Sequence, residues 1–245
     1  MHDQIKKAVD TAQRAQRNYD LSKSVSDIDL ETLIYTAINS PSKQNETHYA
    51  LYVYTDTNII RNIYEQTKLF SLLRDKEDFN KVFKEEDGKF WQSEDLSVHN
   101  SQILSNVLFA YAEDRGIARG GNSKIAHETT DPNTESYRIY KEQVDYSIGI
   151  SAGQVIMAAA MLGYKTGLCS AFPKGRMKNI VNSKYDVKLL VGIGFSNNDV
   201  DRRLHAETLN SDLPEKFRTG ALDEKWKFPS FNKQVKVYIN GSENT

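Results

Sequence analysis

Apolar residues recur every three or four positions in several stretches of the chain, which is the spacing of one face of an amphipathic helix. This spacing predicts helices over 3–18, from Ser26 or Asp27 to near Ser40, over about 57–73 and from about Thr134 to Leu162. A short helix is also expected from Pro173 to about Val181. The apolar face of the second helix comprises Leu30, Leu33, Ile34, Ala37 and Ile38. That helix ends near Ser40 because Pro41 disfavours helical geometry at the residue before it.

Runs rich in β-branched and aromatic residues predict strands over 49–56, 102–114 and 188–196. A half-buried strand is expected over 233–240, because apolar and polar residues alternate there. Two segments have no such pattern. We expect the charge-dense segment 74–95 to cover the surface as an insertion, and 115–133 to form a mobile loop. Both are candidates for shaping a substrate pocket.

The longest predicted helix contains unusually small side chains. Gly149, Gly153 and the three alanines at 158–160 make it slim enough for another element to approach closely. Each glycine costs roughly 1 kcal/mol of helix stability relative to alanine, so a packing contact should compensate. Gly163 fits the end of this helix.

Composition narrows the class of protein. The chain has 245 residues, a formal net charge of −1 and one cysteine. A single domain over 1–245 is expected from this length. Near-neutral charge disfavours sequence-neutral nucleic-acid binding. The lone cysteine excludes an internal disulfide and indicates a reducing compartment. We expect a cytoplasmic protein that does not associate with membranes, since MHDQIKKAVDTAQ lacks a signal-peptide core and VIMAAAMLG (155–163) is too short to span a bilayer.

Two polar signatures carry the candidate chemistry. QRAQRNY (13–19) presents Arg14 and Arg17 three residues apart, which predicts two guanidiniums on one helix face, suited to a phosphate dianion. SPSKQN (40–45) is a proline-containing turn with small hydroxyl and amide side chains, suited to a flat heterocycle. Together they indicate a nucleotide-like cofactor. Each signature also has a simpler interpretation. The two arginines would then lie on a solvated helix face, and the proline turn would only end the preceding helix.

These two signatures and three motifs later in the sequence make the chain resemble the nitroreductase family of FMN-dependent oxidoreductases. RAQRNY is similar to the family's basic opening and SPSKQNETHY to its next conserved segment. The slim helix GISAGQVIMAAAMLGYKTG, the turn CSAF and the strand VGIGFSN followed by DRRLH come in the family's order. Gln13, Ala15 and the segment 47–49 depart from its pattern. These departures bear on phosphate binding and on the choice of substrate and reductant.

The resemblance implies an α+β fold with a central, mostly antiparallel sheet flanked by helices, assembled as an intertwined homodimer. The slim helix 145–163 would lie at the dimer core. A C-terminal arm, about 205–245, would embrace the partner through Trp226, Phe228 and Phe231. Two FMN sites would lie at the interface, each lined by both chains.

The resemblance also implies the contacts to FMN. Arg14, Ala15 and Arg17 would hold its phosphate and pyrimidine edge, while Pro41, Ser42 and Asn45 would reach it across the subunit boundary. The backbone at Cys169, Ser170 and Ala171 would support flavin N5, with no catalytic side chain. A nucleophilic role for Cys169 is disfavoured because no basic neighbour in the local sequence would lower its pKa. Arg202 and Arg203 would add a second clamp on the phosphate, with Arg203 the better candidate by position.

The implied activity is hydride transfer from NAD(P)H through flavin N5 to a nitroaromatic, quinone or flavin-type acceptor. Reductive dehalogenation, flavin fragmentation, a non-catalytic flavin-binding module and a cofactor-free dimeric scaffold remain as alternatives. The five histidines lack metal-ligand spacing, so no metal site is expected. Gly192 and Gly194 lie inside a predicted strand and lack the G-x-G-x-x-G context of a dinucleotide fold.

Overall fold

Four antiparallel strands form the central sheet, in the order β1–β4–β6–β5. They comprise β1 (Tyr49–Tyr54), β4 (Val107–Glu113), β5 (Lys165–Cys169) and β6 (Val187–Gly194). The computed structural model describes residues 1–42, 45–68, 70–71, 97–114, 131–197, 200–203, 237–239 and 242–244. Predictions for 74–95, 115–130 and most of the C-terminal arm lie outside these residues.

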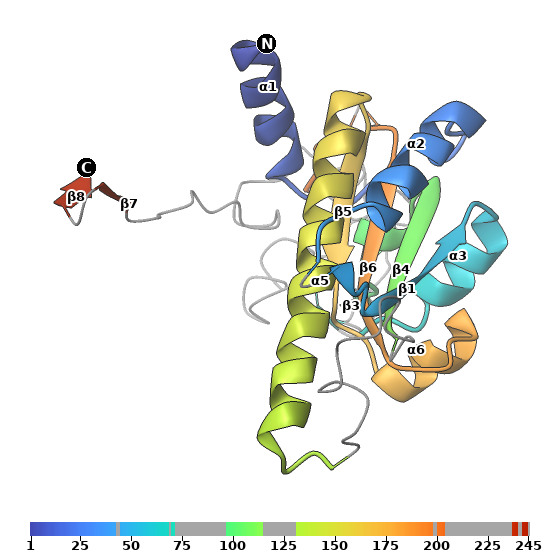
Figure 1. Ribbon diagram of the computed structural model, residues 1–245. Helices are drawn as coiled ribbons and strands as arrows, with labels where there is room; N and C mark the ends of the chain where they lie inside the picture. Colours follow the sequence, from blue (N-terminus) through green and yellow to red (C-terminus); the bar gives the residue numbers. More distant parts are fainter. Residues whose placement is uncertain are drawn as a thin grey trace, which may run out of the picture.

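Helices cover both faces of this sheet (Figure 1). On one face lie α2 (Asp27–Ile38) and the long α5 (Glu135–Met161), with α1 (His2–Ala12) against α5. The other face packs against α3 (Thr57–Tyr64), α6 (Lys174–Val181) and the 3₁₀ turn η2 (Ser101–Ile103). Every residue of β4 is buried, because its side chains alternate between the two layers. The α+β class and the antiparallel sheet are therefore as expected.

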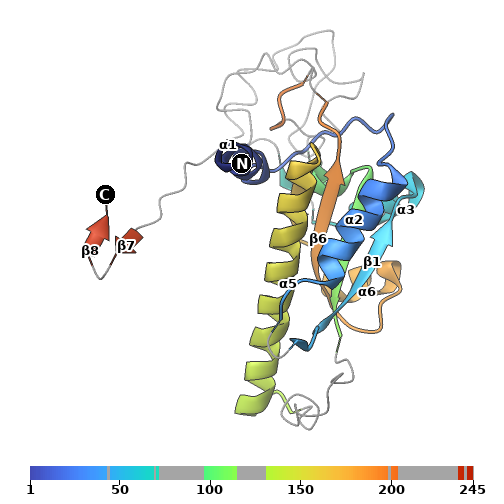
Figure 2. The ribbon, with the colours of Figure 1, turned by 45° about the horizontal axis from the view of Figure 1, so that its top comes forward.

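Two short two-stranded antiparallel sheets lie outside the central sheet. They pair β2 (Phe70–Ser71) with β3 (Ser97–Val98), and β7 (Val237–Ile239) with β8 (Ser242–Asn244). Of the second pair, β7 lies within the predicted strand 233–240, and both strands lie within the predicted arm 205–245. In Figures 1 and 2 it stands away from the four-stranded sheet.

Helix starts follow the sequence closely. Ser26 caps α2, accepting a hydrogen bond from the Asp29 amide at 3.2 Å, and Thr134 caps α5 in the same way. After α5, Gly163 adopts φ +92°, the left-handed geometry that glycine tolerates best. One packing prediction is wrong: Ile38 is 55% exposed, although the other four predicted apolar residues of α2 pack against the core.

Helix ends depart from the sequence prediction. The first helix ends at Ala12 rather than at residue 18, because the Gln16 amide donates to the Thr166 carbonyl of β5 at 2.9 Å. The third ends at Tyr64 rather than near 73, and the Lys68 amide donates to Ala171 at 2.9 Å. In both places the backbone bonds to another segment instead of continuing its helix. Similarly, β4 begins at Val107 rather than at 102, because the preceding residues form η2.

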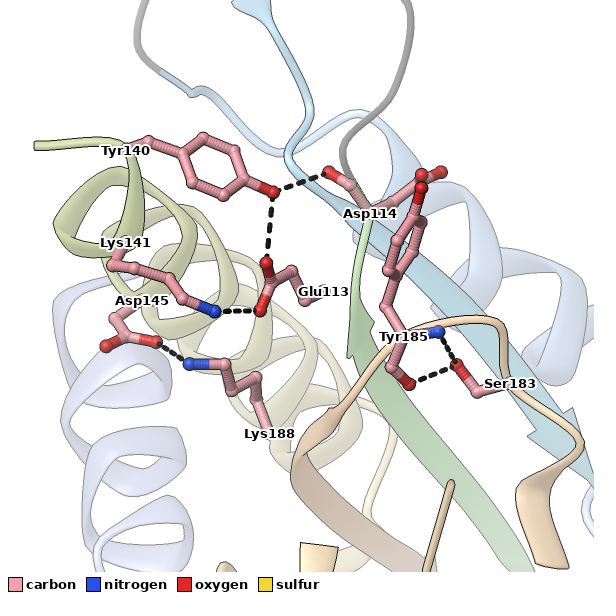
Figure 3. Close-up of polar contacts among 8 residues, drawn as sticks. All are labelled: Glu113, Asp114, Tyr140, Lys141, Asp145, Ser183, Tyr185 and Lys188. Carbon is pink, nitrogen blue, oxygen red and sulfur yellow. Dashed lines mark hydrogen bonds and ion pairs between the residues drawn. The ribbon is translucent and has the colours of Figure 1, made fainter. Parts of the chain in front are cut away.

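A buried ion pair ties α5 to the end of β4 (Figure 3). Glu113, 3% exposed, binds the Lys141 ammonium and accepts from the Tyr140 hydroxyl at 3.3 Å. Burial lowers the pKa of Lys141, but the hydrogen bond and charge of Glu113 outweigh this and leave the pKa raised. One turn further along α5, Asp145 pairs with Lys188 of β6 at 3.2 Å. These contacts fix the long helix against the sheet.

Candidate functional site

The segment that follows α1 crosses the edge of the sheet in a non-helical conformation. Arg14 and Arg17 both lie in it, so the prediction that they share one helix face is wrong. The segment is instead fixed by contacts with the chain after β6: Asn18 Nδ2 donates to the Asp201 carbonyl at 2.8 Å, and the Arg202 guanidinium donates to the Ala15 carbonyl at 3.3 Å. Tertiary contacts therefore bring together arginines that are far apart in sequence.

Arg14, Arg17 and Arg202 form one electrostatic group, the arginine cluster. Burial and, second to it, the nearby charge of Arg202 lower the pKa of Arg17 to about 10. The pKa of Arg202 is lowered by burial and then by the charges of Arg14 and Arg203. Both shifts mean that holding these cations together costs free energy. A bound anion would offset that cost, so the cluster favours a phosphate.

An open pocket of about 580 Å³ adjoins the arginine cluster. Its wall contains five cationic and two anionic side chains; the lining residues are Asp3, Lys6, Lys7, Asp10, Thr11, Arg14, Gln16, Lys165, Ser196 and Arg202. A pocket of this size and charge suits a phosphate-bearing small molecule.

The two arginines after β6 have different environments. Arg203 forms a salt bridge with Asp201, with Nη2 at 2.8 Å from Oδ2 and Nε at 3.1 Å from Oδ1. Arg202 lines the pocket and contacts the backbone of Ala15. The geometry therefore favours Arg202 over Arg203 as the phosphate ligand, against the preference drawn from position alone.

The turn after α2 lies on a different part of the protomer. The Ser40 hydroxyl donates to Gln154 Oε1 of α5 at 2.8 Å, and the pocket wall includes none of Pro41, Ser42 and Asn45. Asn45 has φ +59°, and its amide donates to the Ser42 carbonyl at 3.1 Å. The Ser42 hydroxyl oxygen is buried without a partner among the described residues. A turn with a buried, unused hydroxyl is prepared for a ligand or a second chain.

The end of β5 provides small, exposed residues next to a buried thiol. Ser170 and Ala171 are exposed, and the Ala171 carbonyl accepts from the Lys68 amide. Cys169 is 2% exposed, and its sulfur accepts from Asn100 Nδ2 at 3.1 Å. Burial raises the pKa of Cys169, outweighing the hydrogen bonds that lower it. The thiol is therefore protonated at neutral pH and has a structural role, whereas a planar ring can approach the two residues beyond it.

Comparison with models of known protein families shows to which family the chain belongs. The model of the nitroreductase family matches residues 11–195, which contain most of the elements described above. This chain belongs to the nitroreductase family. A search of curated proteins finds no match.

Solved structures share the nitroreductase fold at low sequence identity. A nitroreductase family protein from Clostridium novyi NT aligns with a TM-score of 0.53 at 14% identity, covering 81% of this chain and 90% of its own. A protein from Staphylococcus epidermidis, named as a candidate NAD(P)H:FMN oxidoreductase, aligns with a TM-score of 0.54 at 15% identity, covering 80% and 89%. At such identities the likeness establishes the fold alone.

One residue next to the end of β5, Gln102 of η2, is not among the candidate site residues predicted from the sequence. Its Nε2 donates to the Leu168 carbonyl at 3.3 Å, next to the end of β5, while its buried Oε1 has no partner in the described part of the chain. A Cβ on Gly167 or Gly192 would lie within 2.5 Å of the Gln102 carbonyl oxygen. These strand glycines therefore make room for η2. Glycine inside a strand is itself a signal of close backbone approach.

Two of the three residues at 47–49, which depart from the nitroreductase pattern, have packing roles, whereas Thr47 is exposed. His48 is buried, with its ring edge-on to Tyr140 at 5.7 Å and Nε2 3.5 Å from the Glu46 carboxylate. The buried Tyr49 hydroxyl donates to the Ala37 carbonyl of α2. Among the described residues, no group of three His, Cys, Asp or Glu side chains is placed to hold a metal ion.

Proposed function

We propose that the protein is an FMN-dependent oxidoreductase that transfers hydride from NAD(P)H to a nitroaromatic, quinone or flavin-type acceptor. The convergence of Arg14, Arg17 and Arg202 beside an open pocket supports this most directly, in a chain of the nitroreductase family. Guanidinium groups bind phosphate through charge-assisted, often bidentate hydrogen bonds. The cluster thus fits the phosphate end of FMN.

Two unsatisfied polar atoms fit the rest of the cofactor. The Ser42 hydroxyl and Gln102 Oε1 are buried without described partners, and each can bond a polar group of FMN. Gln102 lies beside the end of β5, where Ser170 and Ala171 are exposed. Their small side chains leave room for the ring, and their backbone N–H groups can donate to N5.

When bound, FMN supplies the redox chemistry by accepting hydride at N5 and releasing it to the acceptor. The protein's own residues bind and orient the reactants. The arginine cluster anchors the phosphate, and the backbone beyond Cys169 provides hydrogen-bond donors where negative charge develops. Positioning of this kind accounts for several kcal/mol of barrier lowering. No side chain is assigned as a general acid or base.

We propose a homodimer in which the turn at 41–45 reaches the partner's arginine cluster. One face of α5 supports this arrangement, because it carries exposed apolar and glycine residues: Tyr146, Gly149, Ile150 and Gly153. A Cβ on either glycine would meet nothing within 4 Å in the protomer. Their smallness therefore has no use within one chain, whereas a second copy packed closely against α5 would require it. Ser40 bonds to Gln154 of the same helix, so the turn begins next to this face.

The decisive measurement is an absorbance spectrum of the purified protein, before and after anaerobic addition of NADH or NADPH. We expect the bands of oxidised flavin, and we expect them to bleach with the reductant. Recovery of the bands on adding a quinone or nitroaromatic would establish turnover. Bands that persist with both reductants would indicate a non-catalytic flavin-binding module. A protein that stays colourless after incubation with FMN would contradict the proposal.

A further inference from the structure

His99 lies just before η2, in a segment that hydrogen bonds tie to the end of β5. Its Nδ1 donates to the Thr67 carbonyl at 2.9 Å. The amide of the same peptide unit, Lys68 N–H, donates to the Ala171 carbonyl at 2.9 Å. With one peptide unit between these contacts, His99 Nδ1 lies within about 8 Å of the Ala171 carbonyl oxygen. His99 is therefore near the exposed end of β5, where we propose that the flavin ring binds.

The contacts of the His99 ring fix its orientation and leave one nitrogen available. A carbonyl oxygen only accepts, so Nδ1 carries a proton and Nε2 is the atom that can exchange one. Tyr64 packs edge-on against the ring, with centroids 5.4 Å apart. The next residue, Asn100, donates to the buried Cys169 sulfur at 3.1 Å. Among the described residues Nε2 has no hydrogen-bond partner, yet it is not one of their buried unpaired atoms, so it is open to water or a ligand.

We propose that His99 is a catalytic acid that protonates the acceptor during its reduction. The inference rests on the proposed function. A quinone that receives one hydride needs one proton to become the hydroquinone, and histidine exchanges a proton near neutral pH. In this step the Nε2–H bond of the His99 imidazolium breaks and an O–H bond forms on the acceptor. Water then returns a proton to Nε2.

Three other titratable side chains belong to the same network. Tyr64 and Cys169 are 3% and 2% exposed, which leaves little access for an acceptor, and burial raises the pKa of Cys169. Lys68 takes part through its backbone amide, and its side chain is exposed. His99 is thus the member of the network whose partly exposed side chain is also held in one orientation.

The variant His99→Asn tests this proposal, because an asparagine amide can still donate to the Thr67 carbonyl while Nε2 is lost. Rapid mixing measures flavin bleaching by NAD(P)H, and then recovery of the flavin bands with a quinone or with ferricyanide. Recovery with the quinone should slow by about tenfold or more at neutral pH and lose its pH dependence. Bleaching and recovery with ferricyanide, which takes up no proton, should change by less than about twofold. The control His2→Asn makes the same exchange at an exposed residue of α1 and should alter none of these rates.

A second measurement needs no turnover. The chain has five histidines, and the ring-proton NMR signal that is missing in His99→Asn identifies His99. We expect 4-nitrobenzoate, added to the oxidised flavin-bound protein without reductant, to shift this signal. The signal of His2, assigned in the same way from His2→Asn, should stay in place.

Failure of this inference is distinguishable from failure of the proposed function. Recovery with the quinone that is as fast in His99→Asn as in the wild type would overturn the inference alone. Equal slowing with the quinone and with ferricyanide would show a structural role for His99 and would also overturn it, as would an unshifted His99 signal. Absence of bleaching in the wild type would contradict the proposed function, and this inference with it.

Discussion

The charges next to each arginine of the site determine its pKa and its ion-pair partners. Arg17 is half-buried beside Arg202, and both have lowered pKa values because burial and the charges of neighbouring arginines disfavour the cation. Arg203 differs because Asp201 lies against it. The sequence indicates an arginine-rich phosphate site but does not show which guanidinium forms the salt bridge with Asp201. That depends on side-chain packing around the end of β6.

Arg17→Ala should reduce FMN retention without unfolding the protein. A charge-assisted hydrogen bond contributes roughly 1.5–3 kcal/mol, which corresponds to at least a tenfold loss of affinity. Flavin content after dialysis and the thermal unfolding temperature measure the two effects. Arg176→Ala, on the exposed surface of α6, is the matched control. Full FMN occupancy in the Arg17→Ala variant would show that Arg17 does not bind the phosphate.

FMN affinity should fall as the pH rises through about 10. The pKa of Arg17 is lowered to about 10, so above this pH the side chain loses its charge and its attraction for phosphate. Bound phosphate favours the protonated form and moves the loss to higher pH in the complex. Fluorescence titrations at neutral pH and just above pH 10 measure the change. In Arg17→Ala this step should vanish, and its persistence would assign it to another group.

Cys169→Ala should retain activity. The thiol is buried and has a raised pKa, so it is neither accessible nor ionised at neutral pH. The variant leaves Asn100 Nδ2 without its sulfur acceptor, and about 1 kcal/mol of stability should be lost. Steady-state rates and urea unfolding measure these effects. Rapid labelling of the native thiol by a maleimide would contradict this placement.

At the scale of elements, helix starts follow local sequence and helix ends follow tertiary contacts. Ser26 and Thr134 cap their helices with their own side chains, so these boundaries are readable from a few residues. The first helix ends where the Gln16 amide finds the Thr166 carbonyl of a strand far away in sequence. The pattern of residues around the first helix gives no information about a hydrogen-bond partner so far away in the sequence.

The pair Glu113–Lys141 should be important for docking α5 on the sheet. Lys141→Met removes the cation that neutralises a buried carboxylate, and the cost should be about 2 kcal/mol of unfolding free energy. The double variant Glu113→Gln/Lys141→Met should recover part of this loss, because no unpaired charge remains. Urea unfolding of the wild type, the single variants Glu113→Gln and Lys141→Met, and the double variant tests the coupling. A double variant less stable than the sum of its single variants would contradict the ion-pair account.

At the scale of the whole molecule, contacts within the protomer do not account for the residues on the exposed face of α5. This helix has the length and apolar character of a possible membrane span, yet eight of its residues are buried within the protein. Its exposed side combines glycine with Tyr146 and Ile150. We ascribe this face to contact with a second copy.

Gly153→Leu should dissociate the proposed dimer while leaving the protomer folded. Within one chain the added side chain meets open space and improves helix propensity by up to roughly 1 kcal/mol. Across a close interface it would clash. Analytical ultracentrifugation gives the oligomeric state and circular dichroism the fold. Gly175→Leu, also helical and unobstructed, is the matched control. An unchanged mass for Gly153→Leu would exclude this face as the interface.

The sequence by itself determined most elements of the fold, because hydrophobic period, caps and proline act over a few residues. It also determined the family, through the order of five short motifs. Tertiary structure decided where α1 and α3 end, since distant carbonyls compete for their amides. It also decided that Arg202 joins Arg14 and Arg17, and that Gln102 lies against the glycines of β5 and β6. Contacts between segments remote in sequence depend on the packed sheet, which no local pattern encodes.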